Sequence, residues 1–284
     1  MVNENPRLPL LEITSRANAG LGHSTVDKII SESKFHLVVS RKKPFWRGGQ
    51  KEKRKDFSFR RRHWPKSAWG KIVFIDECTI EYDPFPAGKK VRIRQGEELE
   101  ERNLRPSFKS GRTSIGVFAC ISKGKRSDLL LIRKRSDKEQ TSSRDRLGLN
   151  AHQFATEIHQ PFIIPFILAQ DDTPDHIYLA ADGATWHYGG ENKKLREEVG
   201  YLRLPWPPNS PDLNPIENVW MLLKRRLHKR FSTIEQRPHS EAELFSAAQE
   251  VWAQIPQDVI HKLIDSMPER LQAVLDADGG HTKW

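Results

Sequence analysis

The chain has 284 residues, with 47 Lys and Arg against 37 Asp and Glu, and a formal net charge of +10. No segment approaches the roughly 20 consecutive apolar residues of a membrane span, and the first residues form no apolar run of signal-peptide length. The two cysteines, Cys78 and Cys120, are too few for a disulfide framework or a cysteine-based zinc finger. We therefore expect a soluble protein of a reducing compartment.

The net charge is concentrated in the first quarter of the chain. Residues 1–69 contain 16 Lys and Arg and 6 Asp and Glu, and the remaining residues are neutral overall. A concentrated basic segment favours a polyanionic partner, because each cation that neutralises a phosphate releases a counterion. Nucleic acid is the leading candidate, and a solvated tail or a nuclear-import signal is the alternative.

Two short helices are expected near the N-terminus. Leu10 opens a segment that ends near Asn18, glycines follow, and a second helix begins at Ser24, which forms a possible capping box with Asp27. The pair is typical of a helix-turn-helix whose second helix presents residues to the major groove. A small helical hairpin without a DNA-binding role would show the same spacing.

Residues 41–68 are basic, punctuated by Gly and Pro, and interleaved with aromatic residues. This composition predicts a linker that lies along a phosphate backbone, although its last third could be a basic helix that packs on the next domain. The candidate DNA-binding residues are Thr25, Lys28, Arg41, Lys42, Lys43, Arg47, Arg60, Arg61 and Arg62.

From Lys71 the sequence predicts strands and helices in an α/β order. The expected strands are 71–83, 91–94, 113–121, 176–182 and 201–204, and the expected helices are 151–170, 191–198 and one that begins at Pro215. The order β-β-β-α-β-α-β-α is that of a ribonuclease-H-like fold, a mixed sheet flanked by helices, here preceded by a small helix-turn-helix segment.

Three carboxylates lie at informative positions in this order of strands and helices. Asp76 lies within the first apolar strand, Asp182 ends the fourth, and Glu217 lies in the first turn of a later helix. Carboxylates that meet at one edge of a sheet can bind two divalent cations such as Mg²⁺. Asp182 could instead belong to a turn, and Asn214 with Glu217 could form a capping box.

The run LPWPPNSPDLNPIENVWMLLKRRL, residues 204–227, resembles the signature around the third catalytic acid of mariner-type DDE transposases. In one branch of that family 34 residues separate the second and third acids, as they separate Asp182 from Glu217. The segment FIDECTIEY resembles the strand of the first acid, in which Asp76 is the ligand and Glu77 is not. The resemblance extends to the C-terminal segment and to the helix at Ser24.

This resemblance implies a transposase that cleaves DNA and transfers strands at terminal inverted repeats. Asp76, Asp182 and Glu217 would be its catalytic acids and the ligands of two Mg²⁺ ions, for which Mn²⁺ substitutes. The implied partners are transposon ends and target DNA, bound by a homodimer, with no membrane. The expected location is the nucleus in a eukaryote and the cytoplasm otherwise.

The chain departs from the family at two places. Gly183 replaces the usual Asn after the second Asp, and a first helix-turn-helix is missing, so we expect an N-terminally truncated chain. A decayed or domesticated DNA-binding remnant without catalysis is therefore the alternative function. We expect His187 to orient the loop after Asp182 or a phosphate, and Asp212 to have a side chain free to cap a helix or face water.

The expected domains are a partial helix-turn-helix at 1–40, a basic linker at 41–68, a catalytic domain at 69–235 and a C-terminal helical segment at 236–284 that packs on it.

Overall fold

A computed structural model describes residues 22–33, 48–82, 113–132, 150–183, 187, 189–232 and 237–284. The chain divides into two compact units, Met1–Pro44 and Phe45–Trp284. In the first unit, helix α2 (His23–Glu32) buries Val26 and exposes Thr25 and Lys28. No helix in the described ranges is long and apolar enough to cross a membrane.

The start of α2 differs from the sequence prediction. Gly22 is the N-cap residue, and no side chain caps the helix, so the expected capping box of Ser24 and Asp27 does not form there. The expected helix at 10–18 lies outside the described residues.

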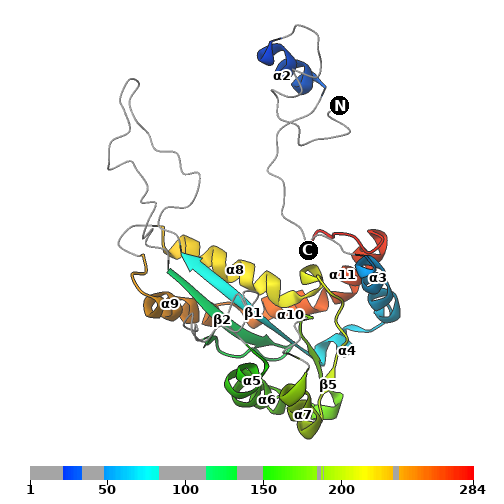
Figure 1. The fold of residues 1–284 in the computed structure, drawn as a ribbon, viewed down its shortest axis with the longest axis vertical. Coiled ribbons are helices and arrows are strands. Elements are labelled where there is room, and N and C mark those ends of the chain that lie inside the picture. Colours follow the sequence, from blue (N-terminus) through cyan, green and yellow to red (C-terminus); the bar gives the residue numbers. More distant parts are fainter. Residues whose placement is uncertain are drawn as a thin grey trace. The chain divides into compact units, whose positions relative to one another are not determined.

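A five-stranded mixed sheet forms the centre of the second unit (Figure 1). Its strands lie in the order β3-β2-β1-β4-β5, with β2 antiparallel to β1 and β3, and β4 parallel to β1 and β5. The strands are β1 (Ile72–Tyr82), β2 (Thr113–Ile121), β3 (Leu130–Ile132), β4 (Tyr178–Ala180) and β5 (Leu202–Arg203). This order is the predicted ribonuclease-H-like arrangement.

Helices cover both faces of the sheet (Figure 1). One face carries α8 (Pro215–Arg230), α9 (Glu241–Ala253), α10 (Gln257–Asp265) and α11 (Met267–Asp276). The other carries α5 (Ala151–Gln153), a π-helical segment (Phe154–Ile163), α6 (Ile164–Leu168) and α7 (Gly190–Val199). Short 3-10 turns lie at Pro174–His176 and Pro211–Leu213.

The third described strand was not predicted. Residues 91–94, which were expected to form a strand, lie outside the described residues, whereas β3 forms from a short apolar run that the sequence left unassigned. A three-residue edge strand gives too short an alternation to recognise, and only its pairing with β2 defines it.

The predicted linker at 41–68 is helical over its described part. Helix α3 (Gln50–Arg61) packs on α11, and α4 (Lys66–Gly70) leads into β1. Phe57 is buried against Trp206, with ring centroids 5.2 Å apart, and Arg54 is also buried. The basic helix that was considered for the last third therefore begins earlier, because its apolar side forms part of the core.

Candidate active site

Asp76 faces the helices α8–α11 because of its position in β1. Ile72, Phe74 and Cys78 belong to the core on that side of the sheet, and alternate residues of a strand point to the same side. Asp76 shares their parity, and its Oδ2 accepts a hydrogen bond from Trp220 Nε1 on α8 at 3.1 Å. Glu77, the next residue, points to the opposite side of the sheet.

Asp182 follows the end of β4 and lies beside β1. Phe74 pairs with Ala180 in the parallel register of β1 and β4. Two residues beyond this pair the chain reaches Asp76 within β1 and Asp182 just after β4, so the register brings the first two acids close together where β4 ends. A Cβ atom on Gly183 would meet nothing within 4 Å, so the loop after Asp182 has room there for the side chain that the family usually has.

Glu217 lies in the first turn of α8, which packs against β1. Asn214 caps this helix by accepting a hydrogen bond from the Ile216 N–H at 3.4 Å. The reciprocal half of a capping box would use the Asn214 N–H, but that group donates to the Pro211 carbonyl at 3.0 Å. Glu217 is therefore not held in the reciprocal capping bond that its spacing allowed.

The three acids repel one another. Burial and the charges of Glu217, Glu77 and Asp182 raise the pKa of Asp76 well above its ordinary value, although the Trp220 hydrogen bond opposes the shift. Burial and the charge of Asp182 likewise raise the pKa of Glu217, and Lys224 opposes this. Mutual repulsion shows that the three carboxylates lie in one electrostatic neighbourhood.

His187 lies between Glu77 and Asp182. Its Nε2 is 3.0 Å from Glu77 Oε1 and its Nδ1 is 3.0 Å from Asp182 Oδ1. The ring packs on Phe154, with centroids 4.7 Å apart, and the side chain is almost fully buried. Burial lowers the pKa of His187, but the two carboxylates overcome this effect and raise it to about 10. His187 thus holds the loop that carries Asp182, as the sequence led us to expect.

The chemistry of the three acids suits a hard divalent cation. Carboxylate oxygens are the donors that Mg²⁺ and Mn²⁺ prefer, and a cation would balance charges that otherwise repel. Within the described ranges, no three His, Cys, Asp or Glu side chains converge closely enough to enclose a metal ion. The three acids are therefore close enough to interact electrostatically and offer the oxygen donors of a Mg²⁺ site, without the convergence of a closed site.

Asp212 corrects a sequence-based expectation. Its carboxylate is neither a cap nor exposed to water, because Arg54 donates to both of its oxygens, at 2.8 and 2.7 Å. Sequence reasoning missed this ion pair because 157 residues separate the partners along the chain. The basic segment before β1 was the only available signal.

The candidate DNA-binding residues fall into three groups. Thr25 and Lys28 are exposed on α2, while residues 41–43 and 47 lie outside the described residues. Arg60 is exposed and pairs with Asp56 at 2.7 Å. Arg61 and Arg62 lie over aromatic rings, 4.2 Å from the Phe57 centroid and 3.7 Å from the Phe59 centroid respectively.

Comparison with known proteins identifies the class of this site. Residues 148–237, which contain the second and third acids, match the family model described as "DDE superfamily endonuclease". The chain is 30% identical to the Tc1 transposase of Caenorhabditis elegans over 266 residues, which are 92% of this chain and 87% of that protein. It is 30% identical to the Tcb2 transposase of Caenorhabditis briggsae over 223 residues, 78% and 73% of the two chains.

A solved structure has the same fold. The crystal structure of a pre-cleavage Mos1 transpososome matches with a TM-score of 0.74 at 17% identity, over 99% of this chain and 78% of that chain. The family model and the fold define a DDE endonuclease. The chain belongs to the Tc1/mariner family of DDE transposases, which cut and rejoin DNA.

Proposed function

We propose that this chain performs cut-and-paste transposition with Asp76, Asp182 and Glu217 as catalytic acids that bind two Mg²⁺ ions, for which Mn²⁺ substitutes. The observation that carries the assignment is the register that brings Asp76 of β1 next to the end of β4, with α8 packed on β1, so that the charges of Asp182 and Glu217 raise the pKa of Asp76. Mos1 structures with Mg and with Mn support the choice of cations.

Each residue around the acids has a defined task in this proposal. Trp220 fixes one oxygen of Asp76, and His187 fixes the loop of Asp182 through Glu77. Bound cations would activate water and stabilise the leaving 3′ oxygen. The freed 3′-hydroxyl then attacks a phosphodiester bond of target DNA and displaces a 3′ oxygen of the target strand, without a covalent protein intermediate, so the side chains contribute position and charge.

The proposed partners are the transposon's terminal inverted repeats and target DNA. Mos1 has been solved as a paired-end complex with the left transposon end, which supports a pair of copies acting on DNA. We assign the first contacts with DNA to Thr25 and Lys28 on α2, which are exposed, and to the basic residues before β1. The related proteins come from nematodes, so we propose the nucleus as the place of action.

The decisive experiment replaces the third acid without changing its shape. Glu217→Gln should abolish Mg²⁺-dependent cleavage of a duplex that carries the terminal repeat, because the amide lacks the charge that a cation requires. The matched control is Glu243→Gln, since Glu243 occupies the same third position of α9, where Ser240 caps its N–H at 3.1 Å.

The control should cleave at the wild-type rate, and both variants should keep a cooperative thermal transition. EDTA should stop cleavage by the wild type. Full cleavage by folded Glu217→Gln would show that Glu217 is not a metal ligand. Cleavage in EDTA would show that the reaction needs no metal ion.

A further inference from the structure

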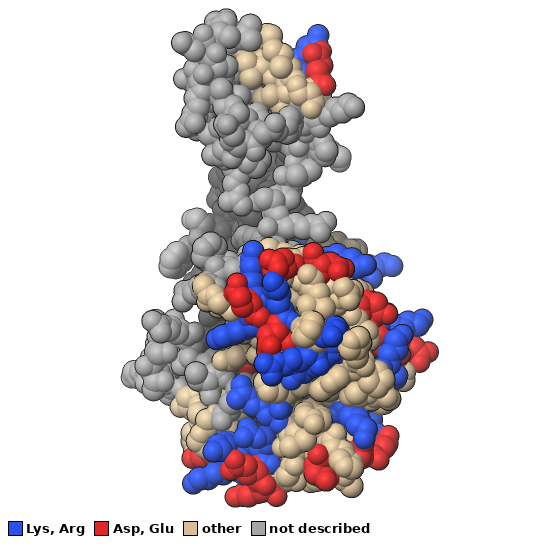
Figure 2. Space-filling view, turned by 90° about the vertical axis from the view of Figure 1, so that its right-hand side faces the viewer, with Lys and Arg blue, Asp and Glu red and all other residues tan. Residues whose placement is uncertain are grey.

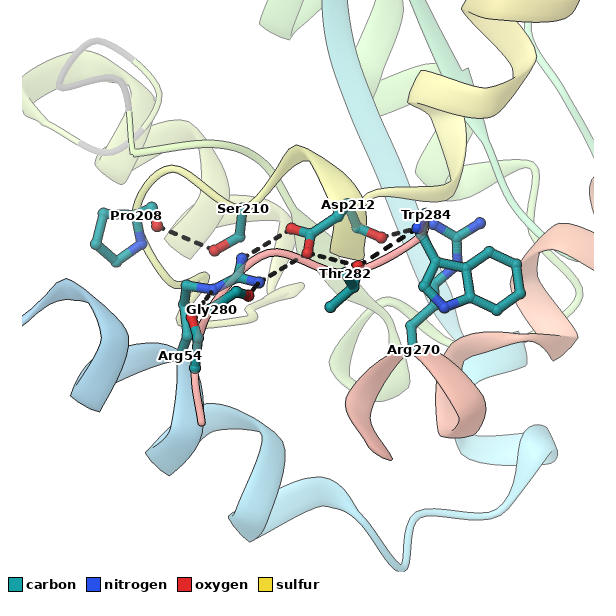
Figure 3. A network of polar contacts seen from close by, with 9 residues as sticks. Arg54, Pro208, Ser210, Asp212, Arg270, Gly280, Thr282 and Trp284 are labelled. Carbon is teal, nitrogen blue, oxygen red and sulfur yellow. Dashed lines mark hydrogen bonds and ion pairs between the residues drawn. The ribbon is translucent and has the colours of Figure 1, made fainter. Parts of the chain in front are cut away.

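The segment after α11 is tied to α3 by one buried guanidinium (Figure 3). Arg54 donates from Nε to the Gly279 carbonyl at 2.9 Å and from Nη2 to the Gly280 carbonyl at 3.1 Å. The same side chain makes the two-pronged ion pair with Asp212, and none of it is exposed. Arg54 therefore joins the C-terminal segment to the loop that leads into α8.

The C-terminal segment also contacts Asp212 directly. Thr282 donates from Oγ1 to Asp212 Oδ2 at 2.8 Å, so this oxygen accepts from two different parts of the chain. Charged acceptors of this kind form stronger hydrogen bonds than neutral ones. The loop before α8 is thus fixed from two sides, five residues before Glu217.

A second buried guanidinium binds residues that lie before and after Glu217 in the sequence. Arg270 on α11 donates from Nη1 to the Asp212 carbonyl at 2.7 Å and from Nη2 to Asn218 Oδ1 at 2.6 Å. Its Nε donates to Ser266 Oγ at 2.9 Å, and its guanidinium lies 4.5 Å from the Trp284 ring centroid. One rigid fork thus spans the loop before Glu217 and the residue after it.

These contacts compensate for a weak helix cap. The hydrogen bond from the Ile216 N–H to the Asn214 side chain is 3.4 Å long, near the limit for such a bond. The start of α8 is therefore held mainly by side chains from α3 and α11, which lie far away in the sequence. Two buried cations are costly, so a geometric role would explain their presence.

We propose that Arg270 is a positioning residue, acting on a loop that Arg54 also holds, and that it sets the place of the Glu217 carboxylate beside Asp76. Neither arginine touches the reacting atoms. This inference rests on the proposed role of Glu217 as a metal ligand. Groups that orient a ligand in this way typically change metal affinity by about 10- to 100-fold when they are replaced.

The test measures Mn²⁺ binding by electron paramagnetic resonance, which needs neither DNA nor turnover. Arg270→Lys keeps the charge but removes the fork, and Asn218→Ala removes only the contact of Arg270 with α8. Both should weaken Mn²⁺ binding at least about tenfold. Thermal unfolding without metal shows which variants fold, and Asn218→Ala is decisive if Arg270→Lys does not fold.

Asp265→Asn is the control, because it breaks the pair of Asp265 with Lys123, 2.7 Å apart, on the neighbouring helix α10. It should bind Mn²⁺ with wild-type affinity. A merely structural role of Arg270 would lower the thermal midpoint and leave the Mn²⁺ affinity of the folded protein unchanged.

Two results would overturn the inference, and they are distinguishable. If Glu217→Gln abolishes Mn²⁺ binding while folded Arg270→Lys and Asn218→Ala bind Mn²⁺ like the wild type, the positioning role is refuted. The metal site itself then stands. If Glu217→Gln binds Mn²⁺ like the wild type, the metal site itself is refuted, together with the positioning that depends on it.

Discussion

At the scale of single residues, the neighbouring side chains distinguish the acidic residues from one another. Asp76 and Glu77 are adjacent in β1, yet one accepts from Trp220 and the other contacts His187. Strand alternation sends them to opposite sides of the sheet. Asp212 differs again, because two-pronged pairing with Arg54 fixes it in a structural role.

The Arg54–Asp212 pair should make stability depend on pH. Burial raises the pKa of Asp212, but the hydrogen bonds and charge of Arg54 outweigh this and lower it below its ordinary value. A carboxyl with a lowered pKa in the folded state stabilises the protein above its unfolded pKa, and this contribution disappears as pH falls through the folded value. Asp212→Asn should lower the free energy of unfolding by about 3 kcal/mol at pH 7, because Arg54 then lacks its counter-ion.

The measurement is urea unfolding of both proteins from pH 7 to pH 3. The difference between them should stay constant above about pH 5 and shrink below about pH 4. Glu250→Gln is the control, since the Arg230–Glu250 pair is exposed and such pairs contribute at most about 1 kcal/mol. A difference that grows toward low pH would contradict the assigned sign.

At the scale of elements, the close approach of the C-terminal segment to α3 depends on one glycine. Gly279 has a φ of +77°, and a Cβ atom there would collide with the backbone carbonyl of Lys51. The Gly279 N–H donates to the Val274 carbonyl at 2.8 Å, which ends α11 in a left-handed turn. The turn then delivers the carbonyls that Arg54 binds.

Gly279→Ala should therefore destabilise the protein more than backbone strain alone requires. Gly200→Ala is the matched comparison, because Gly200 has a φ of +91° after α7 and open space around it. We expect Gly200→Ala to cost about 1 to 2 kcal/mol and Gly279→Ala about 1 to 3 kcal/mol more. Equal losses in urea unfolding would show that α3 and the C-terminal segment separate easily.

At the scale of the whole molecule, most of the net charge belongs to the second unit, Phe45–Trp284. Residues 45–69 contain nine Lys and Arg and two Asp and Glu, whereas residues 1–44 contain seven and four. The folded α3 therefore carries much of the basic segment that the sequence had suggested was a linker. On the face that carries α3, basic and acidic side chains are interspersed (Figure 2).

DNA binding should accordingly depend on salt through α3 as well as through the N-terminal unit. In the full chain, Lys51→Gln with Lys53→Gln should reduce the slope of log affinity against log salt by about 1 to 2, since each neutralised phosphate contributes about 0.9. Both lysines are exposed on α3. The control is Lys193→Gln with Lys194→Gln on α7, a helix that also carries three glutamates.

The measurement is affinity for a duplex at four or more salt concentrations. The α7 pair should leave the slope unchanged. An unchanged slope for the α3 pair would place the phosphate contacts elsewhere.

The sequence by itself determined most of the elements around the site and the chemistry of its residues. Alternation along β1, the acid after β4 and the Asn-Pro-Ile-Glu helix start are local signals that left other interpretations open for Asp182 and Glu217, and the resemblance to DDE transposases selected Asp76, Asp182 and Glu217 as the candidate acids. The order of strands likewise predicted the fold, because short connections leave few topologies open.

Only the tertiary structure decided what holds the third acid in place. The partners of Asp212 lie on α3, on α11 and in the C-terminal segment, and no spacing rule links such distant positions. The basic run was interpreted as a linker along a phosphate backbone because a sequence cannot show that Arg54 lies on the buried side of a helix. Burial of that guanidinium depends on the carbonyls and the carboxylate that the fold gathers around it, and those groups meet only after the chain has folded.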